Sequence, residues 1–227
     1  MMDQERLWDH FQTKDISSFA GSSTRLAFLV AQTPVSGKVL DIGIGAGQFE
    51  RAALDAGRDV YAVDSSEGAI RRISAEFGLG EKARVGSVQS IPFPDDFFGC
   101  VVMSEVLEHL DDNILERGLR EVRRVLKKGG AFIGTVPARE PIEESMVYCP
   151  NCDTTFHRWG HTRTFSLETM RQTLAPHFFI RDVHERLFVN WQQLNWRGKL
   201  VGGVQAACAR LGVRTRNASI VFRAERF

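Results

Sequence analysis

Residues 39–49 read VLDIGIGAGQF, an apolar run that passes into three glycines at alternate positions and then into a stretch compatible with a helix. The apolar run is typical of a buried strand in a parallel sheet. Glycine adopts backbone angles that other residues avoid, and it has no side chain to hold a ligand away. A strand, a glycine turn and a helix N-terminus therefore meet here, which is how α/β proteins hold nucleotide-like ligands.

The spacing of the glycines narrows the choice of ligand. A dinucleotide fingerprint reads G-x-G-x-x-G, whereas this turn reads G-x-G-x-G and has Gln48 where the third glycine would fall. Asp41 stands two residues before the first glycine, and an acid there suits a ligand with a cationic amino-acid end and no phosphates. The pattern closely resembles motif I of the class I methyltransferases that depend on S-adenosylmethionine (SAM). The resemblance implies that the methionyl part of SAM is held by Asp41, Gly43, Gly45 and Gly47.

A second acid ends the next predicted strand, residues 59–64. The carboxylate of Asp64 is well placed to accept two hydrogen bonds from a ribose diol, as in nucleotide-binding βαβ units. The alternative is that this position only begins a helix, because Ser65, Ser66 and Glu67 follow. We interpret Asp64 and Ser65 as cofactor-binding residues.

Three further parts of the chain complete the predicted SAM site. Residues 87–98, SVQSIPFPDDFF, resemble the family segment that meets the adenine edge, which implies contacts from Ser87 and Val88, although Ser87 stands where the family usually has aspartate. Ser104 ends the fourth predicted strand. Arg25 lies on a helix expected before the first strand, where it either faces the SAM carboxylate or is a solvated helix arginine.

Alternating strand and helix patterns between residues 38 and 137 predict an α/β fold. With the resemblance, this implies a doubly wound, Rossmann-like, seven-stranded sheet with helices on both faces. We expect one methyltransferase domain over residues 1–227. It would carry an N-terminal helical cap at 1–33, a Cys/His loop insert at 145–165 and a basic lid-like insert at 190–217.

Glu105, Glu108 and His109 follow the fourth predicted strand, beside the expected place of the SAM methyl group. Positions three and four apart share a helical face, so this set could bind a hard divalent cation such as Mg²⁺ or Mn²⁺. The segment looks like the EVLEH of ubiquinone-biosynthesis O-methyltransferases, and it resembles the metal site of small-RNA 3′-terminal 2′-O-methyltransferases. Without metal, His109 would be the general base or a substrate-side hydrogen bonder, assisted by Glu105 and Glu108.

Cys149, Cys152, His157 and His161 form a second candidate metal site with the spacing C-x-x-C-x4-H-x3-H. Two thiolates and two imidazoles suit a tetrahedral Zn²⁺, and the segment resembles a zinc knuckle. The alternatives are a redox pair or two separate reduced thiols. In the RNA-modifying relatives a histidine after the fifth strand completes the active-site cluster, so the two candidate sites compete for His161.

Composition limits the partners. The 227 residues carry a formal net charge of +1, which argues against nucleic-acid binding by the whole surface. No stretch is apolar for long enough to span a bilayer, the polar start is not a signal peptide, and the four cysteines do not suggest a secreted disulfide framework, so we expect a cytoplasmic protein. Residues 190–217 hold five basic residues and no acid, which suits an anionic substrate, a membrane surface or a lid with a solvated basic face.

These observations predict an enzyme that transfers a methyl group from SAM to an oxygen or nitrogen nucleophile of a small molecule, which is either anionic or membrane-associated. One alternative is 2′-O-methylation of an RNA end, against which the neutral overall charge counts. Another is a non-catalytic SAM-binding regulator or partner subunit. The sequence does not set the oligomeric state.

Overall fold

The computed structural model describes residues 21–191, 194–210 and 218–227. Its centre is a seven-stranded sheet of order β3-β2-β1-β4-β5-β9-β8, in which β9 runs antiparallel to both of its neighbours and the other pairs are parallel. The strands are β1 Lys38–Ile42, β2 Asp59–Asp64, β3 Ala83–Val85, β4 Phe98–Ser104, β5 Leu126–Pro137, β8 Phe179–Leu187 and β9 Ala218–Glu225. The predicted doubly wound sheet is confirmed.

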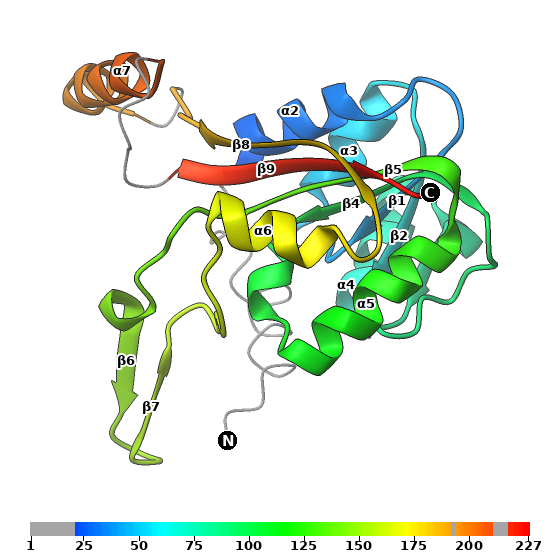
Figure 1. The fold of residues 1–227 in the computed structure, drawn as a ribbon, viewed down its shortest axis with the longest axis horizontal. Coiled ribbons are helices and arrows are strands. Elements are labelled where there is room, and N and C mark those ends of the chain that lie inside the picture. The colour runs from blue at the N-terminus through cyan, green and yellow to red at the C-terminus, as the bar shows by residue number, and fades with distance from the viewer. Residues whose placement is uncertain (1–20, 192–193, 211–217) are drawn as a thin grey trace.

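Helices cover both faces of this sheet (Figure 1). On one face lie α2 Ser23–Gln32, α3 Gln48–Asp55 and α4 Glu67–Phe77; on the other lie α5 Asp112–Val125 and α6 Leu167–Leu174. Three short 3-10 helices are η2 Gly80–Lys82, η3 Leu107–His109 and η4 Ile142–Ser145. Each long helix buries one apolar face against the strands, as its periodicity predicts.

Helix α5 illustrates how the sequence sets this packing. Leu115, Leu119 and Val122 recur at steps of four and three, and all three are buried against the sheet. Helix α6 begins after Ser166, whose side chain accepts from the backbone N–H of Thr169 in a capping box. Ser22 also precedes a helix, but its hydroxyl bonds Gln48 rather than capping α2.

The strand order reverses between β1 and β4, and β4 is the central strand of the sheet. In parallel sheets of this kind, ligands bind at such a switch point, beyond the carboxyl ends of the strands. The carboxyl ends of β1, β2 and β4 are Ile42, Asp64 and Ser104. The residues predicted to bind SAM therefore share one edge of the sheet.

Two segments extend from this core (Figure 1). One is a hairpin of β6 Met146–Cys149 and β7 Thr154–His157, and the other is helix α7 Trp196–Arg210, beyond the end of β8. Only 21–33 of the predicted N-terminal cap, and only 190–191 and 194–210 of the basic insert, belong to the described residues. Within the described ranges, no helix combines the length and apolarity needed to cross a membrane.

Candidate active site

A cavity of about 450 Å³ opens at the carboxyl edge of the sheet. It is lined by nine of the ten predicted cofactor residues, namely Arg25, Asp41, Gly43, Gly45, Asp64, Ser65, Ser87, Val88 and Ser104. The same cavity is lined by Glu105, Glu108, His109 and His161. Its volume lies in the range of small-molecule and cofactor sites. The structure therefore joins the predicted cofactor site and the predicted acid–histidine cluster in one cavity.

The glycine turn that follows β1 brings backbone close to its neighbours. Gly43 has φ 85°, and a Cβ there would lie 2.6 Å from a methyl carbon of Val106. Gly47, the tenth predicted cofactor residue, is not among the lining residues. It adopts φ 81° at the N-cap of α3, and its N–H closes the turn onto the carbonyl of Ile44 at 2.9 Å. Gly43 and Gly45 thus face the cavity, while Gly47 shapes the turn.

Asp64 is held by the backbone on both of its carboxylate oxygens. Oδ2 accepts from the N–H of Ile44 at 3.0 Å, and Oδ1 accepts from the N–H of Ser66 at 2.9 Å. The side chain that caps α4 belongs to Ser66, which accepts from the N–H of Ala69 at 3.2 Å. Each carboxylate oxygen retains further acceptor capacity, so the anchored carboxylate suits a vicinal diol such as a ribose.

Asp41 lies in the cavity wall next to a second buried acid, Glu50 of α3, which the sequence did not single out. Burial, followed by the charge of Glu50, raises the pKa of Asp41 well above its usual range. Burial raises the pKa of Glu50 to about 7. The pair is therefore short of its full negative charge near neutral pH, and a cationic ligand group at Asp41 would favour its ionisation.

We expect Glu50→Gln to stabilise the protein increasingly as pH rises. The folded-state pKa of about 7 exceeds the ordinary value of 4.5, so folding favours protonated Glu50 and stability falls as pH rises toward and through 7. Glutamine has no charge to bury, so its advantage should grow to at most about 3 kcal/mol at pH 8. Denaturant unfolding at pH 5 and pH 8 measures this difference. The exposed Glu81→Gln is the control, and an equal effect of Glu50→Gln at both pH values would refute the expectation.

Arg25 is not a solvated helix residue. Its Nε donates to the hydroxyl of Ser104 at 3.1 Å, and its Nη1 lies 3.8 Å from Oε2 of Glu105. Glu105 is the first residue after β4 and has φ 58°, which is uncommon for a residue other than glycine. Its Oε1 is buried and has no hydrogen-bond partner among the described residues. Arg25 therefore ties α2 to the end of β4 at the cavity wall.

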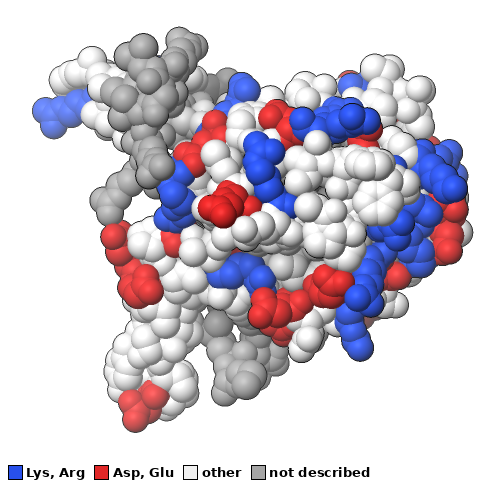
Figure 2. Space-filling model, in the orientation of Figure 1, with Lys and Arg blue, Asp and Glu red and all other residues white. Residues whose placement is uncertain are grey.

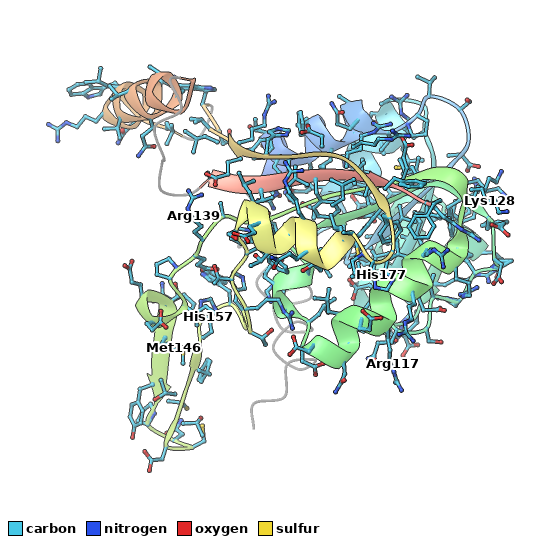
Figure 3. The ribbon with its side chains drawn as sticks, in the orientation of Figure 1. Arg117, Lys128, Arg139, Met146, His157 and His177 are labelled. Atoms are coloured by element: carbon cyan, nitrogen blue, oxygen red, sulfur yellow. The ribbon has the colours of Figure 1, made fainter. Side chains whose placement is uncertain are left out.

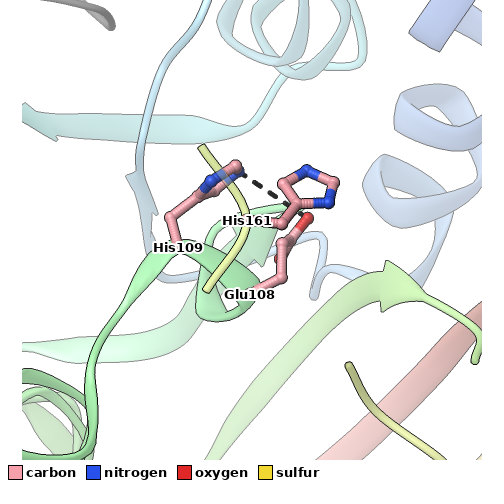
Figure 4. Close-up of side chains that lie close together, drawn as sticks. All are labelled: Glu108, His109 and His161. Atoms are coloured by element: carbon pink, nitrogen blue, oxygen red, sulfur yellow. Dashed lines mark ion pairs between the residues drawn. The ribbon is translucent and has the colours of Figure 1, made fainter. Parts of the chain in front are cut away.

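Glu108, His109 and His161 converge on one point of the cavity (Figure 4). One ligand atom from each lies within 4.8 Å of the others, and Oε1 of Glu108 lies 3.9 Å from Nε2 of His109. Glu108 is only 1% exposed, and neither of its oxygens has a hydrogen-bond partner in the described part of the chain. Burial, and then the charge of Glu105, raise the pKa of Glu108. A buried carboxylate without a hydrogen-bond partner suits the coordination of a cation.

His109 is poorly suited to the predicted role of general base. Burial, followed by the charge of His161, lowers the pKa of His109 to about 3. An imidazole with so low a pKa stays neutral at physiological pH and accepts a proton only weakly. Neutral imidazole is also the form that binds metals.

Glu140 and His157 stand behind His161, on the side away from the cavity. Nδ1 of His161 pairs with Oε2 of Glu140. Nδ1 of His157 accepts from the N–H groups of Trp159 and His161 at 3.3 and 3.1 Å, which puts its proton on Nε2, 3.5 Å from Oε1 of Glu140. Although burial raises the pKa of Glu140, its bond with His161 and the two histidine charges lower it overall. With Nδ1 engaged, His161 is left with Nε2 for the cavity.

The predicted zinc set does not converge. Cys149 pairs with Thr154 near the tip of the hairpin, whereas His157 pairs with Met146 at the other end (Figure 3). Three residues along a strand span roughly 10 Å, beyond the reach of one tetrahedral ion. Cys149 and Cys152 are free, and His161 turns to the active-site cavity. The prediction that Cys149, Cys152, His157 and His161 form a single site does not match this structure.

Several residues of the site were not expected from the sequence. Gln48 and Trp159 line the cavity, while Glu50 and Glu140 lie just behind it. Glu50 could have been noticed as an acid next to Phe49 on the sheet-facing side of α3. Glu140 follows the end of β5, at the same edge as the other acids. No sequence pattern marked Trp159 as a site residue, because its position depends on the path of the loop that follows β7.

Similar proteins agree with this geometry. A family model described as a methyltransferase domain matches residues 40–134. The methyltransferase YcgJ of Bacillus subtilis is 31% identical over 125 residues, which are 53% of this chain and 49% of that protein. The ubiquinone/menaquinone biosynthesis C-methyltransferase UbiE of Yersinia pestis is 31% identical over 122 residues, 48% of this chain and 47% of UbiE. The chain thus spans about half the length of the curated relatives it matches.

A solved structure extends the likeness to nearly the whole chain. The Burkholderia thailandensis 1,6-didemethyltoxoflavin-N1-methyltransferase, crystallised with 1,6-didemethyltoxoflavin and S-adenosylhomocysteine, aligns with a TM-score of 0.66. The alignment covers 98% of this chain and 86% of that chain at 16% identity. The family match shows that residues 40–134 form a methyltransferase domain, and the structural likeness extends the fold of such enzymes to nearly the whole chain.

Proposed function

We propose that this protein transfers a methyl group from SAM to an oxygen or nitrogen nucleophile of a small acceptor. The observation that carries the proposal is the single cavity, in which Gly43 and Asp64 lie with Glu108 and His161. The sulfonium of SAM supplies a methyl group that is already activated by charge. The task left to the protein is to align the nucleophile and remove its proton.

The cofactor end of the cavity suits each part of SAM. Asp41, paired with Glu50, would meet the cationic amino group, and ionisation of the pair would strengthen that contact. Asp64 would accept the ribose hydroxyls with both of its anchored oxygens. Ser87 and Val88 line the part of the cavity assigned to adenine. A bound SAM would thereby direct its methyl group toward the far end of the cavity.

The acceptor end suits a divalent cation such as Mg²⁺ or Mn²⁺, held by Glu108, His109 and His161 with Glu105 beside them. The unpartnered oxygens of Glu108 and Glu105 support this assignment. Such a cation, when bound, would supply Lewis acidity that lowers the pKa of an acceptor hydroxyl. Glu105 and Glu108 would orient the acceptor, and with no cation on its Nε2, His161 would take the acceptor proton there. This donor set favours an oxygen nucleophile.

A second candidate is 2′-O-methylation of an RNA end. The specific observation in its favour is that His161 joins Glu108 and His109, since a histidine in this place completes the resemblance to the small-RNA methyltransferase site. Either acceptor would offer a hydroxyl to the same cluster.

One experiment tests both candidates. Purified protein is incubated with methyl-labelled SAM and Mn²⁺ in a cell extract, and the labelled product is identified after separate nuclease and small-molecule fractionation. Label in small molecules supports the first candidate, and label in RNA ends supports the second. Failure to bind SAM or S-adenosylhomocysteine in calorimetry, with tight binding of NADH instead, would refute the cofactor assignment.

We expect Glu140→Ala to weaken Mn²⁺ binding and lower the methyl-transfer rate by about 10- to 100-fold, the usual effect of losing a partner that orients a ligating histidine. SAM affinity should not change, because Glu140 does not line the cavity. Calorimetry with Mn²⁺ and with SAM measures the two effects separately. Glu140→Gln should recover part of the loss, since its amide oxygen can still accept from His161. The exposed Glu143→Ala is the matched control, and an unchanged Mn²⁺ affinity in Glu140→Ala would refute the positioning role.

A further inference from the structure

Helix α7 presents its large apolar side chains to solvent. Trp196 is 71% exposed, Leu200 65% and Val204 58%. These residues are four apart and so form one stripe along the helix, with the exposed Val201 beside it. A helix packed in the ordinary way would turn this stripe toward the core.

The opposite side of α7 includes two glycines, which face the chain segment just before the helix. A Cβ at Gly198 would lie 3.1 Å from Leu194, and one at Gly202 would lie 3.2 Å from Val189. Gly198 and Gly202 are also four apart and are turned away from the apolar stripe. Two of the smallest residues of α7 therefore contact the segment that leads into it, and the apolar stripe lies on the other side of the helix.

Charge selects the kind of partner for this stripe. Residues 190–217 contain five basic residues and no acid. Those in α7 include Arg197 and Lys199, and the Arg197 guanidinium lies 5.3 Å from the ring of Trp196. Figure 2 shows α7 as an uncharged surface with basic residues at its outer end. Tryptophan and basic residues flanking exposed aliphatic side chains are the features of helices that lie in an anionic membrane interface.

The segment that leads into α7 is bonded to α2 beside the wall of the active-site cavity. The side-chain amide of Asn190 donates to the hydroxyl of Ser23 at 3.1 Å, and the hydroxyl of Thr24 donates to the carbonyl of Val189 at 3.5 Å. These contacts fix the start of the segment to the first turn of α2. The neighbouring residues Ser22 and Arg25 line the cavity.

We propose that α7 is a membrane-contact helix that lies flat on a bilayer rich in anionic headgroups. Trp196, Leu200 and Val204 enter the interface, while Arg197 and Lys199 meet the phosphates. This contact is independent of the proposed methyl transfer. It also gives the methyltransferase site a class of acceptor, namely an amphiphile that enters the cavity from the bilayer beside α7.

The test is flotation of the full chain with phosphatidylcholine vesicles, with and without phosphatidylglycerol. The protein should float with the anionic vesicles, and added salt should weaken this binding. Arg197→Glu should weaken it at least about fivefold. The double variant Leu200→Asp and Val204→Asp should weaken it at least about tenfold. Thermal unfolding of these variants should match that of the wild type, since the replaced side chains already lie in solvent.

Val35→Asp is the matched control, because Val35 is 78% exposed but lies outside α7, and this variant should float like the wild type. Three results would overturn the proposal. They are no binding to anionic vesicles, equal binding to neutral and anionic vesicles, and a dimer in light scattering that the double variant converts to monomer. The last would assign the stripe to a second copy of the chain.

Discussion

Replacing His161 with alanine should lower the rate of methyl transfer by about 10²- to 10⁴-fold, the range for losing a positioned acid–base group. His161 is the residue through which Glu140, behind the cavity, reaches Glu108 and His109 within it. Without the imidazole, the cluster loses one candidate metal ligand. The Glu140 carboxylate also loses the Nδ1 group with which it pairs. Mn²⁺ affinity should fall by more than the 10- to 100-fold expected for an outer partner. The rate is measured with labelled SAM and the acceptor identified from extract, and Mn²⁺ affinity by calorimetry.

The dissociation constant for SAM separates this effect from a general loss of structure. It should stay near the wild-type value, because Asp41, Asp64 and the glycine turn do not contact His161. His184→Ala supplies the same substitution at an exposed histidine on β8, and it should behave like the wild type. Turnover and Mn²⁺ binding at wild-type levels in His161→Ala would remove His161 from the mechanism.

The fold could be predicted because its signals are local. Val39 to Ile42 is a short, mainly apolar run that ends at a glycine turn and indicates a buried strand, and the steps from Leu115 to Val122 indicate a helix packed on one face. Ser166 marks the start of α6 through a cap that involves residues three apart. Signals of this kind need no knowledge of distant contacts, so the alternating strands and helices of the central sheet up to β5 followed from the sequence.

The cofactor end of the site was predictable for the same reason. Asp41, Gly43 and Gly45 belong to one turn, and Asp64 reaches that turn through a single parallel pairing of β1 with β2. Backbone geometry alone places these residues. The one departure is Gly47, which the turn itself requires and which does not line the cavity.

The acceptor end of the site was less predictable from the sequence, because it depends on the path of the loop that follows β7. The spacing of Cys149, Cys152, His157 and His161 is compatible with a zinc knuckle, but spacing does not reveal that the intervening residues form a hairpin. The ladder carries the cysteines to the tip and His157 to the base. The loop after β7 then brings His161 to the cavity. His161 pairs with Glu140, which no local sequence pattern marked.

Replacing Asp64 with asparagine should weaken SAM binding by at least about 100-fold, because the new amide would present N–H groups where two backbone donors and the ribose hydroxyls need acceptors. In the wild type, both oxygens accept from the N–H groups of Ile44 and Ser66. An asparagine can satisfy only one of them, so one buried donor is left unpaired at a cost of about 1–3 kcal/mol in stability. Calorimetry with S-adenosylhomocysteine, below the lowered melting temperature, separates the loss of affinity from the loss of stability.

The same strand offers the matched control. Asp59→Asn makes the identical change at the other end of β2, where the carboxylate is exposed and pairs with Lys82 at 2.8 Å. A surface pair of this kind contributes less than about 1 kcal/mol, so both stability and affinity should stay close to the wild type. Equal affinities of Asp64→Asn and Asp59→Asn would mean that Asp64 only supports the turn. The ribose would then have to be bound by another residue of the cavity, with Ser65 the nearest polar candidate in the sequence among its lining residues.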